Sequence, residues 1–246
     1  MTMLAIIGGS GLTALDGLKI TRQQMQQTPY GEPSGPLTFG NFNDKEIVFL
    51  PRHGNPHVIP PHKINYRANI WALKENNIRN IIAINAVGGI TQEMYPGRIV
   101  IPSQIIDYSW GRKHTYFDED IDRVTHVDFS HPYSDTLRQH LMQAVKETDI
   151  DCFFGGTYGT TQGPRLESNA EIRRMETDGC DLVGMTGMPE AALARELQLD
   201  YASVCIVANW AAGKSDDSIT MEIIEKNLQI GITRVCDLLE AVIPLI

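Results

Sequence analysis

The sequence predicts an α/β fold built around a parallel or mixed central β-sheet. Short apolar runs recur along the chain, and segments with helical periodicity separate several of them. Hydrophobic residues make up 42% of the 246 residues, which is enough to fill the core of one domain. We therefore expect a single domain that spans residues 1–246.

The apolar runs are the expected strands, because each is short and bounded by polar residues, glycine or proline. In chain order they are residues 4–7, 47–50, 81–86, 99–101, 182–185 and 202–208.

Two segments have the three-to-four-residue spacing of an amphipathic helix. In residues 64–76, Ile64, Ala68, Trp71 and Ala72 fall on one face. The last segment is the clearest, with apolar residues at Ile224, Leu228, Ile232, Val235, Leu239 and Val242. The stretches 29–36 and 116–132 are rich in proline, glycine or polar residues and are expected to be loops.

Composition and charge exclude several classes of protein. A formal net charge of −9 argues against nucleic acid or an anionic membrane as the partner. The four cysteines are scattered without a CxxC pair, which fits reduced thiols better than a zinc site or a disulfide scaffold. The start lacks the basic region of a signal peptide, and no run approaches the roughly 18 apolar residues of a membrane span. We expect a cytoplasmic protein.

The first strand leads into a glycine-rich loop at residues 8–12. Its glycines permit close approach to a phosphate, and Ser10 adds a hydroxyl donor. Residues 9–14 also match the dinucleotide fingerprint, which needs a following helix and then a second strand. Gly17 interrupts that helix, so dinucleotide binding is the weaker alternative.

Two further loops follow strands and carry anion donors. Arg52 can clamp two anionic oxygens in its planar fork, and His53 can donate a hydrogen bond. His53 and His57 have an HxxxH spacing, but Gly54 interrupts the helix that would aim both at one metal, so no metal site is expected. The loop at 85–90 offers the Asn85 side chain and backbone amides.

A fourth corner lies at residues 184–190, between a strand and a helix. Thr186 offers a hydroxyl and an amide at the helix start, where anions are favoured. A plain capped helix, with Glu190 complementing the helix dipole, is the alternative interpretation. Together with the other three loops, this corner favours phosphate or a phosphorylated ligand.

The sequence also resembles a known family, the trimeric purine nucleoside phosphorylases, which include the methylthioadenosine and methylthioinosine phosphorylases. The resemblance covers nearly the whole chain and is strongest at residues 52–54, 65–73, 163–167 and 184–194. It implies a mixed, distorted central β-sheet flanked by helices, a homotrimer, and cleavage of a purine nucleoside by inorganic phosphate as co-substrate. It implies no metal and no organic cofactor.

The resemblance assigns roles residue by residue. Its phosphate-binding positions are matched by Ser10, Arg52, His53, Ala86 and Thr186, with Asn85 where methylthioadenosine phosphorylases usually carry threonine. Met185 matches the ribose position, and base recognition falls to Leu166, Glu167 and Asn209. The expected catalytic residues are Asn209, Arg52 and His53.

The base-pocket residues favour a 6-oxopurine. Asn209 can accept a hydrogen bond from N7–H of the leaving purine and donate one to O6. Glu167 can accept from N1–H of a 6-oxopurine but would face a lone pair on adenine N1. Methylthioadenosine phosphorylases carry aspartate at the Asn209 position and a second acid at the position of Ala211. Strand capping by Asn209 and a solvated Glu167 are the alternatives.

The 5′ end of the nucleoside is expected to meet an apolar wall. Relatives that act on inosine and guanosine place a histidine there, whereas this chain offers Ile219, Met221 and Ile224, which could also serve ordinary core packing. His126 lies in the loop that, in relatives, reaches the neighbouring subunit's site. The expected reaction therefore converts S-methyl-5′-thioinosine and phosphate to hypoxanthine and 5-methylthioribose 1-phosphate. Methylthioadenosine and inosine or guanosine remain the alternative substrates.

Overall fold

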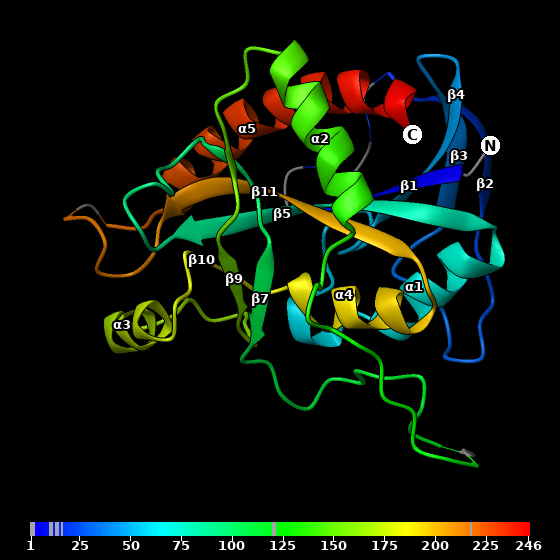
Figure 1. Cartoon of the computed structure of the whole chain (residues 1–246), viewed down its shortest axis with the longest axis horizontal. Helices are drawn as coiled ribbons and strands as arrows, with labels where there is room; N and C mark the ends of the chain where they lie inside the picture. The colour runs from blue at the N-terminus through cyan, green and yellow to red at the C-terminus, as the bar shows by residue number, and fades with distance from the viewer. Residues whose placement is uncertain (1–2, 10–11, 13–14, 16, 120–121, 217) are drawn as a thin grey trace.

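The computed structural model describes residues 3–9, 12, 15, 17–119, 122–216 and 218–246. Within them, an 11-stranded mixed sheet carries helices on both faces (Figure 1). The strands are β1 (Met3–Gly8), β2 (Lys19–Gln24), β3 (Leu37–Phe42), β4 (Lys45–Pro51), β5 (Ile78–Gly89), β6 (Ile99–Ile101), β7 (Gln104–Asp107), β8 (Cys152–Phe154), β9 (Thr157–Thr160), β10 (Leu182–Gly184) and β11 (Asp200–Trp210). The helices are α1 (Tyr66–Glu75), α2 (Asp135–Glu147), α3 (Asn169–Thr177), α4 (Gly187–Glu196) and α5 (Met221–Val242), with short 3₁₀ turns at Pro61–Lys63 and Ile243–Leu245.

The central strands are buried on both faces, which explains their continuous apolar sequences. In β1, Leu4 and Ile6 face a core cluster shared with α2 and α5, whereas Ala5 and Ile7 face a second cluster shared with α1 and α4. Alternate residues of one strand thus hold the two helical layers to the sheet.

The sheet branches at the carboxyl end of β5. Its main order is β2-β3-β4-β1-β5-β10-β9-β7, and β11 runs parallel to β5 and also pairs with β6. Gly88 pairs with Val183 of antiparallel β10 and with Asn209 of β11, and a bulge interrupts the β11 register between Val207 and Asn209. This junction brings three strand ends together beside the carboxyl ends of β1 and β4.

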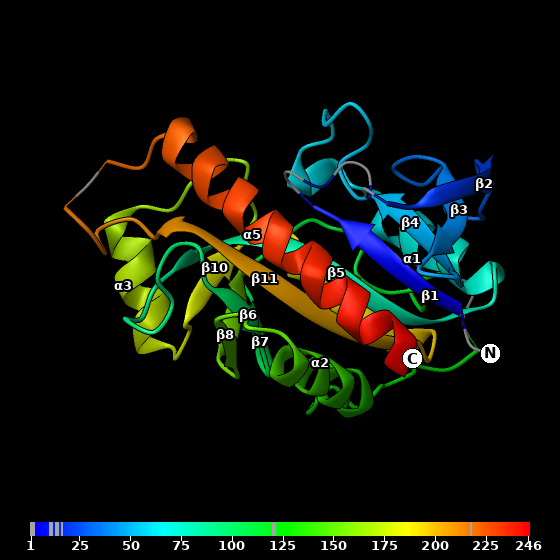
Figure 2. The ribbon, with the colours of Figure 1, turned by 90° about the horizontal axis from the view of Figure 1, so that it is seen from above.

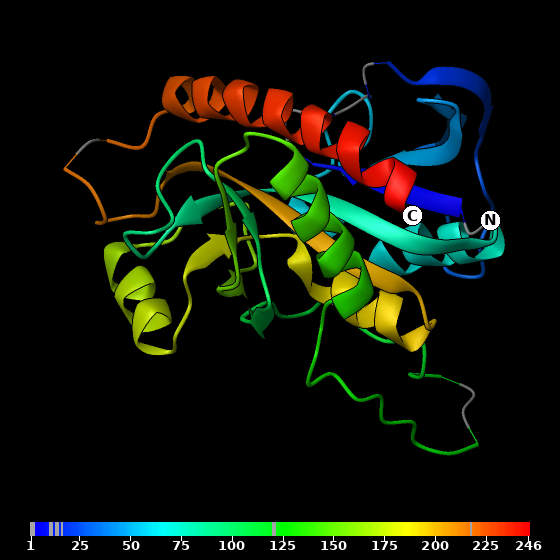
Figure 3. The same cartoon turned by 45° about the horizontal axis from the view of Figure 1, so that its top comes forward.

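Two helical layers cover the sheet. Seen from above, α5 runs along β11, and α2 lies beside it on the same face (Figure 2). Turning the molecule shows α2 crossing in front of that sheet face (Figure 3). Helices α1 and α4 pack together on the opposite face, and α3 stands at the far end beside β9 and β10 (Figure 1).

The predicted fold class is confirmed, with several boundaries corrected. The first helix begins at Tyr66 rather than residue 64, because the Asn65 side chain accepts from the Ala68 amide and caps it. The expected strand at 81–86 extends to Ile78–Gly89. Residues 29–36 form no named helix or strand, nor do the described residues of 116–132.

Strand β2 is the clearest element that the apolar runs miss. Its sequence is polar and its residues are mostly exposed, because it pairs only with β3 at the sheet edge. The neighbours of β1 are β4 and β5, so β2 is not the parallel partner that a dinucleotide fold requires. No described helix is long and apolar enough to cross a membrane.

Candidate active site

A pocket of about 680 Å³ opens at the carboxyl ends of β1, β4, β5 and β11. Ligands of open α/β sheets bind at such strand ends. The pocket collects most of the residues singled out in the sequence. Those that line it are Arg52, His53, Ala86, Leu166, Glu167, Met185, Thr186, Asn209, Ile219, Met221 and Ile224.

Three predicted site residues remain, of which the structure describes two. Asn85 is buried beneath the pocket and contacts Thr186 rather than the cavity. Ser10 falls outside the described residues. His126 is exposed in the loop before α2 and does not line the pocket of its own chain, so its predicted role in a neighbouring subunit stays a prediction.

Arg52 is held by a buried carboxylate. Its Nε and Nη2 atoms donate to the two Glu190 oxygens, both at 2.8 Å, and its Nη1 donates to the Ile84 carbonyl oxygen at 2.8 Å. Arg52 and Glu190 are both 0% exposed. Burial alone disfavours the guanidinium charge, but Glu190 outweighs it and raises the pKa of Arg52. Glu190 and Ile84 therefore hold three of the five guanidinium protons, which leaves at most two Nη protons for a ligand on a side chain that has no solvent-exposed surface in this structure.

This arrangement gives Glu190 a second role, because the sequence suggested only that it complements the helix dipole from the first turn of α4. It lies in α4, is fully buried, and also accepts a hydrogen bond from the Tyr201 hydroxyl at 2.8 Å. The pair joins residues 138 positions apart, so no local pattern in the sequence marks it. The only indication in the sequence that Glu190 belongs to the site was its position close to Thr186.

His53 is neutral and oriented. Its Nδ1 donates to the Ile59 carbonyl oxygen at 2.8 Å, which leaves Nε2 with a lone pair. Burial, followed by the neighbouring Arg52 cation, lowers the pKa of His53 to about 4. Its ring stacks on His57 with centroids 4.3 Å apart. At neutral pH the Nε2 atom of the neutral ring thus accepts a hydrogen bond from a ligand, such as a phosphate hydroxyl, instead of donating one as the sequence suggested.

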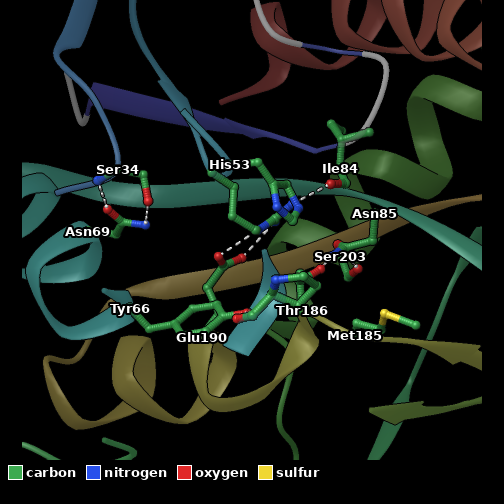
Figure 4. Close-up of polar contacts among 12 residues, drawn as sticks. Ser34, His53, Tyr66, Asn69, Ile84, Asn85, Met185, Thr186, Glu190 and Ser203 are labelled. Carbon is green, nitrogen blue, oxygen red and sulfur yellow. Dashed lines mark hydrogen bonds and ion pairs between the residues drawn. The ribbon is translucent and has the colours of Figure 1, made fainter. Parts of the chain in front are cut away.

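A chain of three side chains aims the Thr186 hydroxyl at the pocket. Ser203 Oγ donates to Asn85 Oδ1, and Asn85 Nδ2 donates to Thr186 Oγ1, each at 2.8 Å (Figure 4). Since Thr186 accepts in this chain, its own hydroxyl proton can be donated, either to the Tyr158 oxygen or to a bound anion. Ser203 was not singled out in the sequence, because a serine inside an apolar strand carries no distinguishing signal.

Another part of the pocket lining carries a carboxylate, Glu167, and an amide, Asn209. Thr161 Oγ1 donates to Glu167 Oε1 at 2.6 Å, and burial raises the pKa of Glu167. Asn209 Nδ2 donates to the Trp210 carbonyl oxygen at 2.7 Å. One Glu167 oxygen, together with the oxygen and the second amide proton of Asn209, is left for a ligand.

Helix α5 and the segment before it form the remaining wall. Ile219 and Ile224 are half-buried and Met221 is 65% exposed, and all three line the cavity. Glu225 and Gln229 also line it, so the wall is apolar with a polar rim. Among the described residues, no group of three or more metal-ligating side chains is present.

The phosphorylase superfamily model matches residues 3–244. The chain therefore belongs to the phosphorylase superfamily. Within it, the chain is 54% identical over 235 residues to a Pseudomonas syringae pv. tomato protein named probable S-methyl-5′-thioinosine phosphorylase, covering 96% of each sequence. It is 45% identical over 251 residues to the 6-oxopurine nucleoside phosphorylase of Pyrococcus furiosus, covering 100% of this chain and 94% of that protein.

Solved phosphorylase structures share the fold. Methylthioadenosine phosphorylase from Schistosoma mansoni in complex with adenine superposes with a TM-score of 0.95 at 32% identity, covering 100% of this chain and 92% of that one. The predicted resemblance to this family is confirmed.

Proposed function

We propose that the protein is a purine nucleoside phosphorylase that cleaves S-methyl-5′-thioinosine with inorganic phosphate. The products are hypoxanthine and 5-methylthioribose 1-phosphate. The names of the Pseudomonas and Pyrococcus relatives agree with this substrate class. One observation carries the proposal: Glu167 and Asn209 line the same pocket as the apolar wall formed by α5 and the segment before it.

Glu167 and Asn209 match the hydrogen-bonding edge of a 6-oxopurine. The free Glu167 oxygen accepts from N1–H, while Asn209 accepts from N7–H and donates to O6. A 6-aminopurine would present a lone pair at N1 to Glu167 and an amine to the Asn209 amide protons. An unpaired buried polar group costs about 1–3 kcal/mol, so this pairing favours hypoxanthine over adenine.

The α5 wall favours a methylthio group over a hydroxyl at the 5′ position. Ile219, Met221 and Ile224 offer apolar surface, and a methylthio group gains from leaving water against such a surface. A 5′-hydroxyl would need a hydrogen-bonding partner to compensate for its lost hydration.

Phosphate is proposed to bind between Thr186, His53 and the free edge of Arg52, with Ser10 and the Ala86 main chain completing the site. As the bond from C1′ to the purine breaks, its electrons go to the base, which takes up a proton at N7 beside Asn209; in the overall balance this is the proton that hydrogen phosphate loses on becoming the sugar phosphate ester. A phosphate oxygen then bonds to C1′. The side chains orient phosphate and nucleoside and stabilise the developing charges, so no covalent intermediate is needed.

The remaining partners follow the family resemblance. We propose a cytoplasmic homotrimer with one phosphorylase domain per chain, in which His126 reaches the methylthio end of a neighbouring site. Phosphate is a co-substrate, and no metal or organic cofactor takes part. Nucleic acid and membranes are not partners, in keeping with the net charge of −9.

Hypoxanthine release from methylthioinosine tests this function when it is followed with and without phosphate. We expect turnover only with phosphate, and 5-methylthioribose 1-phosphate in equal amount to the base. Release of free methylthioribose without phosphate would show a hydrolase and contradict the proposal.

Hypoxanthine binding should depend on the ionisation of Glu167. Burial raises the pKa of Glu167, so the carboxylate form is present above that raised value and is lost as the pH falls through it. A hydrogen bond to a charged group exceeds one to a neutral group by about 1.4 kcal/mol, so affinity should fall about tenfold. Calorimetric titration of the protein with hypoxanthine between pH 8 and pH 4 measures this change in affinity. The matched Glu167→Gln variant should show no such fall, and equal pH dependence in both proteins would contradict the role of Glu167.

A further inference from the structure

Arg112 is a buried arginine whose charge is met by main-chain oxygens. It lies in the segment between β7 and α2 and is 9% exposed. Among the described residues, no carboxylate forms an ion pair with it. The arginine guanidinium is planar and has five N–H donors, so it can bind several acceptors at fixed angles, which a lysine cannot do.

Each terminal nitrogen of Arg112 holds a different loop. Nη2 donates to the carbonyl oxygens of Thr161 at 3.1 Å and Gln162 at 2.9 Å. Nη1 donates to the carbonyl oxygen of Met185 at 2.9 Å and to that of Met188. The Nε atom adds a bond to the Gln162 side-chain oxygen at 3.2 Å. Nη1 also donates to the Tyr66 hydroxyl of α1 at 3.3 Å. One guanidinium thus joins two loops that are remote in sequence and ties them to α1.

Both loops bear pocket residues. Thr161 and Gln162 lead directly into residues 163–167, which we call the base loop and which end at Glu167. Met185 precedes Thr186, and residues 184–188 form what we call the phosphate corner. The two also touch directly, because a Cβ added at Gly163 would lie 2.4 Å from Met185 Sδ. The distance between the two loops is therefore set by two features, namely their direct contact and the hydrogen bonds from Arg112 to both.

We propose that Arg112 is a positioning residue that sets the distance between the base loop and the phosphate corner. The proposal rests on the proposed function, in which the nucleoside spans both loops. Free hypoxanthine needs the base loop, and free phosphate needs the phosphate corner, but a nucleoside aligned for reaction needs both at one spacing. A small misplacement in such a site costs about 100-fold in rate.

The Arg112→Lys variant tests this role, because lysine keeps the charge but cannot bridge the loops. We expect kcat/KM for methylthioinosine to fall about 100-fold. The Kd values of hypoxanthine and phosphate, measured separately by calorimetry, should stay within about threefold of the wild type, because each ligand uses one loop. The control is Arg138→Lys, since Arg138 also donates to a main-chain oxygen, that of Pro102 at 3.1 Å, but from α2 and outside the pocket lining. That control should retain wild-type kcat/KM.

Two results would overturn the role of Arg112. One is a kcat/KM for Arg112→Lys within threefold of the wild type. The other is a loss of hypoxanthine and phosphate binding in proportion to the lost turnover, which would indicate a general structural role. Should the lysine variant fail to fold, Gln162→Ala removes a single acceptor and should show the same pattern at about tenfold; unchanged turnover there would equally overturn it. Failure of the proposed function is distinguishable, because it would appear as absent turnover in the wild-type protein.

Discussion

Replacing Asn209 by aspartate should shift the base preference by about a thousandfold from 6-oxopurines toward 6-aminopurines. In the variant, a carboxylate oxygen would face O6 of a 6-oxopurine, which repels it, whereas the 6-amine of an adenine nucleoside would gain an acceptor. Two such changes at about 2 kcal/mol each amount to that ratio. Sites built on hydrogen bonding to one purine edge can discriminate this strongly.

The measurement is the ratio of kcat/KM for methylthioinosine to that for methylthioadenosine. Asn227→Asp is the matched control, because Asn227 also donates its amide to a main-chain oxygen, that of Ala208 at 2.8 Å, but does not line the pocket. The control should keep the wild-type ratio. An unchanged ratio in Asn209→Asp would contradict the base-pairing argument.

Replacing Glu190 by glutamine should lower the free energy of unfolding by about 3–5 kcal/mol. The substitution leaves the Arg52 cation buried without its counter-charge, and breaking a buried pair on one side costs that much. The Tyr201 hydroxyl can still donate to the glutamine oxygen, so the loss reports mainly on charge. Urea unfolding of both proteins measures it.

The chain provides an exposed pair of the same geometry as a control. Arg165 binds both Glu171 oxygens at 2.9 Å, but the two side chains are 72% and 45% exposed. Glu171→Gln should cost no more than about 1 kcal/mol, because water screens an exposed pair and glutamine can keep the capping bond to Ser168. Equal losses in the two variants would show that burial does not decide the strength of the Arg52–Glu190 pair.

The sequence predicted the central fold because buried strands and long amphipathic helices leave apolar signals. Strands β1, β4, β5 and β11 and helix α5 are such elements. Edge strand β2 leaves no such signal, because most of its residues are polar and exposed. Helix α2 did carry an apolar signal, because Leu137, Leu141 and Ala144 are buried at helical spacing. It was missed because its apolar residues do not form one continuous run.

Three of the four loops with anion donors follow β1, β4 and β5, which are parallel and therefore end at one edge of the sheet. The fourth follows β10, which is antiparallel to β5, and the remaining pocket residues were expected only from the family resemblance. The residues that support the pocket residues were not predictable from the sequence. Glu190, Ser203 and Arg112 act through partners far away in the sequence, and each sits in a segment where its residue type is ordinary. The protonation state of His53 likewise depends on burial and on Arg52, which only the folded chain brings together.

We propose that this pocket binds a 6-oxopurine at one end and a methylthio group at the other. The most direct measurement compares kcat/KM for phosphorolysis of methylthioinosine, methylthioadenosine, inosine and guanosine by the wild-type protein. We expect the highest value for methylthioinosine. A higher value for methylthioadenosine would contradict the roles of Glu167 and Asn209, and a higher value for inosine or guanosine would contradict the apolar wall of α5.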